Sequence, residues 1–272
     1  MRDNPTLKEA LSQAAGALQN QKEAAILLAH HLKKDRLYLI THEDDILQDP
    51  DAYFALIRRR EAHEPIEYIT SRVSFYGEVF HIAPGALIPR PETELLIDHV
   101  KTVIEKNGFT RIAEIGTGSG VIAVMLARFF PHLKITATDI NPDALAIARK
   151  NALDFGVAEQ IELIHTAYLD GINQNFAMIV SNPPYIAEDF PLEKPLGYEP
   201  QNALFGGRRG DEILREIIDI ACKQGVAYLA CEMGYDQRAP LATYMREKGI
   251  EKFSFYQDYS GFDRGFVAQL KE

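Results

Sequence analysis

Over roughly the first 64 positions of the chain, apolar residues recur with the spacing of amphipathic helices. Thr6 and Glu9 form a capping-box pair that begins the first helix, and Asp49 before Pro50 marks a later helix start. The segment contains no Gly-rich loop and no cluster of acidic and basic side chains. We therefore predict a small all-helical domain over residues 1–72, whose role is recognition of a partner rather than chemistry.

The pattern changes at residue 73. Residues 73–83 read V-S-F-Y-G-E-V-F-H-I-A, and this alternation predicts a short hairpin that turns near Gly77. A proline-rich crossing follows, and residues 92–107 then show a helical pattern closed by Gly108. We expect residues 73–90 to form a hairpin linker.

Beyond residue 110, strand-like and helix-like segments alternate. The predicted strands are residues 111–115, 134–139, 161–166, 177–181 and 226–231, and the predicted helices are residues 121–130, 142–155 and 211–223. This order is typical of an α/β fold, a doubly wound, Rossmann-like parallel sheet with helices on both faces. Residues 253–257 and 265–270 have no helix between them, which predicts an antiparallel carboxyl-terminal hairpin. We assign residues 91–272 to this α/β domain and expect it to be the catalytic one.

Composition narrows the class of protein. The chain has 272 residues, 25% of them charged, and no apolar run long enough to cross a bilayer, so we expect no membrane association. The first residues lack a secretory leader, and the two cysteines, Cys222 and Cys231, fall in a predicted helix and strand. We therefore expect a cytoplasmic protein without disulfides. The eight histidines show no metal-binding spacing, so we expect no metal.

The formal net charge is −10, which disfavours a nucleic-acid partner because phosphate binding depends on Lys and Arg. No long basic run occurs apart from residues 58–60. We therefore expect no direct contact with nucleic acid, and a basic protein partner suits the charge better. The alternative is that the excess of acidic over basic residues serves only to keep the protein soluble.

A glycine-rich loop follows the first strand of the predicted sheet. The loop reads Gly116, Thr117, Gly118, Ser119 and Gly120. Glycines there permit a tight turn and close approach of a ligand to the backbone, although a tight turn alone would also explain them. Asp139 ends the next strand, roughly twenty residues after the glycine-rich loop. At this separation in doubly wound folds, an acidic side chain accepts hydrogen bonds from ribose hydroxyls. The spacing differs from the dinucleotide-binding G-x-G-x-x-G, so the loop predicts an adenosyl ligand and disfavours an oxidoreductase.

A second motif occurs at the carboxyl end of a later strand, on the same sheet edge. It consists of Asn182, Pro183, Pro184 and Tyr185. A planar amide nitrogen is a poor nucleophile because its lone pair is delocalised into the carbonyl group. Two rigid acceptors, the side-chain oxygen of Asn182 and the backbone carbonyl of Pro183, would receive both N–H groups and localise that pair. Tyr185 offers a ring to sandwich the flat group.

The alternative is a simple Asn-Pro-Pro turn, which would require neither the aromatic residue nor the position opposite the glycine loop. The motif therefore predicts direct methyl transfer from S-adenosylmethionine to nitrogen, with Asn182 also near the cofactor.

With these motifs in place, the chain resembles the HemK/PrmC-type release factor glutamine methyltransferases over nearly its whole length. The matching blocks are residues 88–94, the loop 116–120, residues 182–185, residues 198–200 with 203–204, and residues 232–237. The resemblance implies a helical amino-terminal domain that helps to hold the release factor and a seven-stranded methyltransferase domain. It also implies the substrate, the glutamine of the Gly-Gly-Gln loop of peptide chain release factors.

The resemblance further implies that Tyr168 contacts the adenine of the cofactor, at a position where members often have tryptophan. A partly buried aromatic residue at a strand end is the alternative. Arg90 and Glu92 have two possible roles. Either both line the mouth of the active site, or Arg90 is only part of a stiff linker between two prolines and Glu92 is only a favourable charge at the start of a helix. Any role of Glu232 stays open.

Two other functions remain as alternatives. One is an adenine-N6 methyltransferase acting on DNA or RNA, because the exocyclic amino nitrogen of adenine is also a poor nucleophile and would suit the Asn-Pro-Pro-Tyr motif. The net negative charge and the helical domain weigh against this function. The other is a non-catalytic module that binds an adenosyl ligand. We expect a monomer, but the sequence identifies neither the oligomeric state nor which release factors are modified.

Overall fold

The computed structural model describes residues 4–271 and divides into two compact units. The smaller unit runs to Arg72 and also includes the distant segment Glu193–Tyr198. The larger unit comprises Val73–Leu192 together with the chain from Glu199 onward. Within the described residues no helix combines the length and the apolar character that crossing a bilayer requires.

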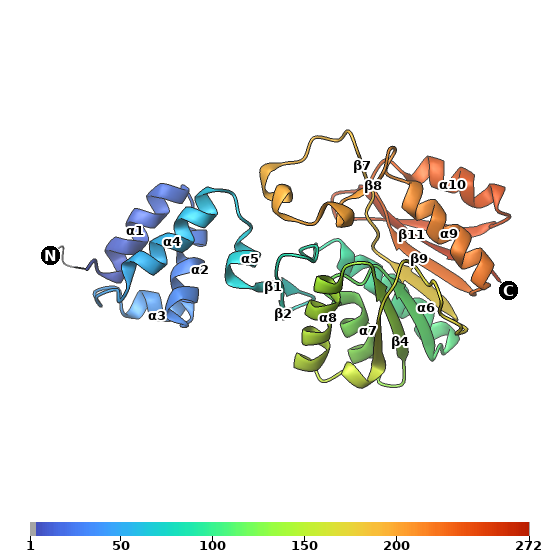
Figure 1. Cartoon of the computed structure of the whole chain (residues 1–272), viewed down its shortest axis with the longest axis horizontal. Helices are drawn as coiled ribbons and strands as arrows, with labels where there is room; N and C mark the ends of the chain where they lie inside the picture. The colour runs from blue at the N-terminus through green and yellow to red at the C-terminus, as the bar shows by residue number, and fades with distance from the viewer. Residues whose placement is uncertain (1–3, 272) are drawn as a thin grey trace. The chain divides into compact units, whose positions relative to one another are not determined.

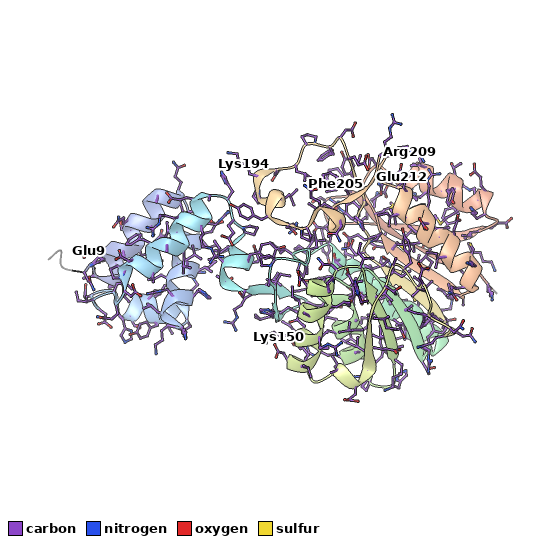
Figure 2. All side chains as sticks on the ribbon, viewed as in Figure 1. Glu9, Lys150, Lys194, Phe205, Arg209 and Glu212 are labelled. Atoms are coloured by element: carbon purple, nitrogen blue, oxygen red, sulfur yellow. The ribbon has the colours of Figure 1, made fainter. Side chains whose placement is uncertain are left out.

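The smaller unit is helical (Figure 1). Its helices are α1 (Leu7–Leu18), α2 (Gln21–Leu32), α3 (Arg36–Thr41), α4 (Pro50–Glu61) and the short α5 (Ile66–Thr70). Thr6 and Glu9 form the expected capping box, in which each side chain accepts a hydrogen bond from the other's backbone N–H (Figure 2 labels Glu9). The buried hydroxyl of Tyr53 on α4 donates to the backbone oxygen of Ala24 on α2, which satisfies the polar tip of a core aromatic residue.

A hairpin made of β1 (Arg72–Phe75) and β2 (Glu78–His81) follows. Its two turn residues, Tyr76 and Gly77, have φ angles of 53° and 77°. Two consecutive left-handed residues give the tight turn whose twist matches the flanking strands. The turn therefore lies where the alternating pattern placed it.

The larger unit is built on a seven-stranded sheet of order β10-β11-β9-β6-β3-β4-β5. The strands are β3 (Arg111–Ile115), β4 (Lys134–Asp139), β5 (Ile161–His165), β6 (Met178–Ser181), β9 (Tyr228–Glu232), β10 (Lys252–Gln257) and β11 (Asp263–Gln269). The five strands from β9 to β5 are parallel, whereas β11 pairs antiparallel with both β9 and β10. The predicted α/β class and the carboxyl-terminal antiparallel hairpin are confirmed.

Helices cover both faces of this sheet (Figure 1). They are α6 (Thr93–Asn107), α7 (Val121–Phe129), α8 (Pro142–Asp154), α9 (Glu212–Gln224) and α10 (Arg238–Glu247). Buried residues of α9 and α10, such as Leu214, Ile218 and Leu241, pack on apolar side chains of the central strands in one continuous core. The sheet edge formed by the carboxyl ends of its parallel strands therefore stays available for a site.

The segment between β6 and α9 is more structured than the sequence pattern indicated. The two short strands β7 (Ile186–Ala187) and β8 (Phe205–Gly207) pair in parallel, and two 3₁₀ turns, Lys194–Tyr198 and Gln201–Ala203, lie between them. Helix α10 was not predicted either, because Pro240 interrupts a short stretch in which apolar and polar residues are mixed. Pro240 lies in the first turn of the helix, where a missing N–H costs nothing.

Candidate active site

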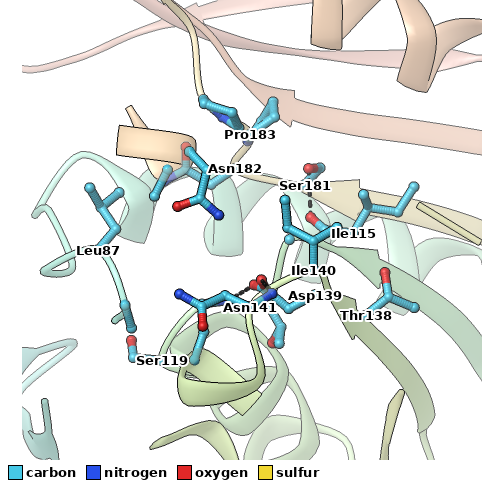
Figure 3. Close-up of a pocket in the computed structure, with 18 of the residues that line it drawn as sticks. Leu87, Ile115, Ser119, Thr138, Asp139, Ile140, Asn141, Ser181, Asn182 and Pro183 are labelled. Atoms are coloured by element: carbon cyan, nitrogen blue, oxygen red, sulfur yellow. Dashed lines mark hydrogen bonds between the residues drawn. The ribbon is translucent and has the colours of Figure 1, made fainter. Parts of the chain in front are cut away.

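A cavity of about 340 Å³ opens at the carboxyl ends of β3, β4 and β6, entirely within the larger unit (Figure 3). The predicted site residues that line it are Gly116, Thr117, Gly118, Ser119, Asp139, Tyr168, Asn182, Pro183 and Pro184. The two motifs are separated by more than 60 positions in the sequence, yet the sheet brings them to one space. The cavity therefore joins a predicted cofactor site to a predicted substrate site.

The glycine loop leaves its backbone open toward this cavity. Gly116 and Gly118 have φ angles of 71° and 55°, and a Cβ atom added to either would meet no protein atom within 4 Å. The N–H groups of Gly116 and Thr117 both donate to the carbonyl oxygen of Thr138, which ties the loop to β4. Glycine here does not serve packing, so the open space beside the backbone suits a ligand.

Asp139 ends β4 and presents a fixed carboxylate to the same cavity. Its Oδ2 accepts from the N–H of Gly118 at 2.9 Å, and its Oδ1 accepts from the N–H of Asn141 at 2.8 Å (Figure 3). Burial raises the pKa of Asp139, and the two N–H donors offset part of that rise by favouring the ionised form. Each oxygen keeps a further acceptor position, which suits hydroxyl donors.

Tyr168 also lines the cavity and adopts a left-handed φ of 49°, a backbone conformation that is costly for a residue with a side chain. Burial, followed by the nearby Glu216, raises the pKa of its phenol to about 12. Its ring is therefore held neutral beside the predicted adenosyl site.

Asn182 directly follows β6, and its carboxamide points into the cavity (Figure 3). Its Nδ2 donates to the hydroxyl of Thr93 at 3.1 Å. The preceding residue, Ser181, is fully buried and donates its hydroxyl to the carbonyl oxygen of Ile115, which fastens the end of β6 to β3. The motif is therefore held by the sheet rather than by a flexible loop.

Gly206 of β8 explains how the chain after Asn182 is packed. A Cβ atom at Gly206 would lie 2.5 Å from the carbonyl oxygen of Pro184 and 2.9 Å from the Cα of Tyr185. Only glycine permits this approach, because the contacts are with backbone that cannot move aside. The β7–β8 pair thus supports the motif from outside.

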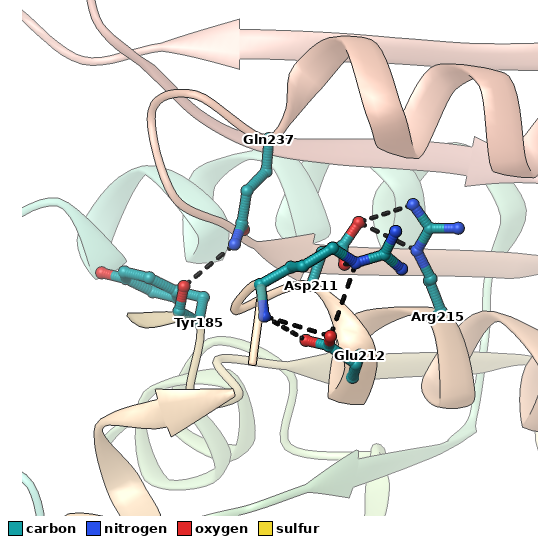
Figure 4. A network of polar contacts seen from close by, with 6 residues as sticks. Tyr185, Asp211, Glu212, Arg215 and Gln237 are labelled. Atoms are coloured by element: carbon teal, nitrogen blue, oxygen red, sulfur yellow. Dashed lines mark hydrogen bonds and ion pairs between the residues drawn. The ribbon is translucent and has the colours of Figure 1, made fainter. Parts of the chain in front are cut away.

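Two predicted site residues do not line the cavity. Gly120 packs against α8, where an added Cβ would lie 2.9 Å from the Cβ of Ala148, so its glycine serves helix packing at a φ of 81°. Tyr185 is half-buried, its hydroxyl donates to Glu232 at 3.1 Å, and its carbonyl oxygen accepts from Gln237 (Figure 4). Burial raises the pKa of Tyr185 well above its usual range.

Arg90 and Glu92, whose roles the sequence left open, are absent from the cavity lining among the described residues. The Arg90 guanidinium pairs with the buried carboxylate of Glu199, and that carboxylate also accepts from the N–H of Ile88 at 2.9 Å. Arg90 therefore holds the segment that lines one side of the cavity.

Sequence reasoning missed a second buried carboxylate. Glu114 lies behind the glycine loop, 1% exposed, and accepts from the Thr117 hydroxyl at 2.9 Å. Its Oε1 has no hydrogen-bond partner among the described residues, and burial raises its pKa to about 8. A charged residue inside the apolar strand R-I-A-E-I was the signal that would have identified it.

Comparisons with known proteins place both parts of the chain. A family model described as "Methyltransferase small domain" matches residues 91–191, and one described as "PrmC N-terminal domain" matches residues 7–70. Curated proteins named release factor glutamine methyltransferase match along almost their full length. The one from Koribacter versatilis is 37% identical over 97% of this chain and 98% of its own. That of Buchnera aphidicola is 34% identical over 100% of both chains, and that of Clostridium acetobutylicum 31% over 96% and 98%.

Solved structures show the fold alone. The hMettl16 catalytic domain, determined in complex with MAT2A 3'UTR hairpin 6, aligns with a TM-score of 0.60 at 18% identity, covering 83% of each chain. The N-terminal domain of human METTL16 in complex with SAH aligns with a TM-score of 0.54 at 17% identity, covering 85% of this chain and 86% of its own.

Proposed function

The chain belongs to the release factor glutamine methyltransferase family, and on that premise we propose that it methylates the N5 side-chain nitrogen of the glutamine in the Gly-Gly-Gln motif of release factors. It is a methyltransferase, and S-adenosylmethionine is its cofactor. The observation that supports this substrate best is the position of Asn182, whose carboxamide enters the same cavity as the glycine loop and Asp139. An amide acceptor beside a cofactor site is what a glutamine side chain requires.

The residues of the cavity fit S-adenosylmethionine. In our proposal the Asp139 carboxylate accepts from the ribose hydroxyls, and the open backbone at Gly116 to Ser119 faces the amino acid part of the cofactor. Tyr168 and the apolar lining beyond Asp139, such as Ile140 and Ala144, flank the adenine. When bound, the cofactor supplies an electrophilic methyl group on a sulfonium centre.

The chain's contribution to the chemistry is made at the substrate nitrogen. Asn182 Oδ1 and the Pro183 carbonyl oxygen each accept one of the two amide N–H groups, which holds the lone pair toward the methyl group and stabilises the positive charge that develops. Neither Pro183 nor Pro184 has an N–H donor that would compete for these acceptors. After transfer the nitrogen releases one proton to water, and no covalent enzyme intermediate forms.

The helical residues 1–72 have in this proposal the role of holding the release factor, residues 73–90 form the linker, and residues 91–272 perform catalysis. None of the residues that the structure describes in the helical unit is among those that line the cavity. Recognition at a distance from the reacting atoms is a common use of such a unit.

The test is a set of parallel incubations with methyl-labelled cofactor and either a release factor, duplex DNA or RNA. We expect label only in the release factor, and label in a nucleic acid would favour the adenine-N6 alternative. Asn182→Ala should abolish transfer while leaving cofactor binding measurable by calorimetry. Asn107→Ala, at the exposed end of α6, is the matched control and should behave as wild type.

A further inference from the structure

Four polar side chains form one hydrogen-bonded series that begins at the lining of the cavity, where Asn182 and Thr93 lie, and continues to Glu232 and Tyr185. Asn182 Nδ2 donates to Thr93 Oγ1 at 3.1 Å, and Thr93 Oγ1 donates to Glu232 Oε2 at 2.7 Å. The other carboxylate oxygen, Glu232 Oε1, accepts from the Tyr185 hydroxyl at 3.1 Å. Thr93 begins α6 and Glu232 ends β9, and their side chains are 2% and 1% exposed respectively. Water therefore does not compete for the bond between Thr93 and Glu232.

The number of protons available in this series determines which group donates and which accepts in each hydrogen bond. An ionised carboxylate only accepts, so the single hydroxyl proton of Thr93 is committed to Glu232. The oxygen of Thr93 can then only accept from Asn182, and the carboxamide must turn its NH₂ group toward it. That orientation leaves Asn182 Oδ1 as the group offered to the substrate. In the reverse orientation the amide oxygen of Asn182 would face the Thr93 oxygen, which are two acceptors with no proton between them.

Resting on the proposed function, we infer that Thr93 and Glu232 are positioning residues that hold the Asn182 carboxamide in the one orientation able to accept the glutamine N–H. Neither touches the reacting atoms. Their effect is on which of two nearly isosteric groups, oxygen or NH₂, faces the substrate nitrogen. The rotation that exchanges the two changes no packing, so shape alone does not select the productive orientation.

The charge state of the Glu232 carboxyl group decides which groups of the series donate and which accept, so protonation of Glu232 can change the orientation of Asn182. Burial raises the pKa of Glu232 to about 7, while the hydroxyls of Thr93 and Tyr185 oppose that rise. A protonated Glu232 can donate to Thr93, whose hydroxyl is then free to donate to Asn182 Oδ1 and so stabilise the unproductive orientation. The titratable and charged groups that face Glu232 are Glu92, which raises its pKa, Arg264, which lowers it, and the phenols of Tyr185 and Tyr256.

Thr93→Val and Thr93→Ser form a matched pair of variants. Valine keeps the shape and removes the hydroxyl, whereas serine keeps the hydroxyl. We expect kcat to fall about ten- to a hundredfold in Thr93→Val, with little change in KM or cofactor affinity, and to recover in Thr93→Ser. Wild-type kcat should decline as pH falls through about 7, and Glu232→Gln should have a lower kcat without that decline.

A measurement that does not depend on activity separates this inference from the proposed function. The side-chain NH₂ resonances of Asn182 in ¹⁵N spectra, assigned by their loss in Asn182→Asp, should shift with pH around 7 in the wild type. They should not shift in Glu232→Gln, and they should move to solvent-like positions in Thr93→Val. Unchanged resonances and unchanged kcat in Thr93→Val would overturn the inference. If the wild type methylates no glutamine, the proposed function fails, and the spectra still decide whether the series orients Asn182.

Discussion

Asp139→Asn tests the cofactor site directly. The carboxylate accepts from the N–H groups of Gly118 and Asn141 and has acceptor positions left for the two ribose hydroxyls. An amide group replaces one accepting oxygen by a donor and removes the charge. One charge-assisted hydrogen bond is lost and the other becomes neutral, so about 2–4 kcal/mol of binding free energy should disappear. That loss corresponds to a Kd for S-adenosylmethionine raised about 30- to 1000-fold.

The assay is isothermal titration of each variant with S-adenosylmethionine, alongside a thermal melt that confirms folding. The matched control is Asp154→Asn, which removes a carboxylate of the same type at the exposed end of α8, where it pairs with Lys150. We expect the control to bind as wild type. A folded Asp139→Asn protein whose Kd lies within about twofold of wild type would refute the reasoning, since such a small change is less than one hydrogen bond.

Three further predictions concern stability. Gly120→Ala should lower the free energy of unfolding, measured by chemical denaturation, by about 2–4 kcal/mol, because the added Cβ would lie 2.9 Å from the Cβ of Ala148 at a positive φ. The control Gly16→Ala, in open space within α1, should leave that free energy unchanged or raise it. Asn151→Ala should lower the free energy of unfolding by about 2–5 kcal/mol, because two half-buried backbone groups of His81 and the buried carbonyl group of Ser119 lose their partner, and an unchanged melting temperature would contradict this. Glu114 has a folded pKa of about 8 against 4.5 for the free side chain, so the folded state holds a proton that the unfolded state has lost as pH rises between these values. Stability should therefore fall with pH in this range, by up to about 1.4 kcal/mol per pH unit, and Glu114→Gln should flatten that decline in urea titrations at several pH values.

Much of the fold was predictable because its signals are local. The alternation around Gly77 located a hairpin, Asn141 before Pro142 located the start of α8, and the strand–helix alternation indicated the parallel sheet. The resemblance to release factor glutamine methyltransferases is likewise confirmed by relatives that match over almost the whole chain.

The parts that were missed depend on contacts between distant residues. Gly118 and Gly120 look equivalent in the sequence, yet one faces the cavity and the other packs on Ala148, a difference that only the position of α8 decides. Thr93 and Glu232 are 139 positions apart, and no spacing rule connects them to Asn182. Their link through one hydroxyl becomes visible only when α6 and β9 are placed side by side.

In the proposed function, Asn182 presents an oxygen to a glutamine amide nitrogen beside the cofactor. The most direct measurement is tandem mass spectrometry of a release factor after incubation with S-adenosylmethionine and either wild-type enzyme or Asn182→Ala. We predict a single added methyl group on the side-chain nitrogen of the glutamine in Gly-Gly-Gln with the wild type, and none with the variant. A methyl group on any other residue, or equal methylation by the variant, would contradict the account.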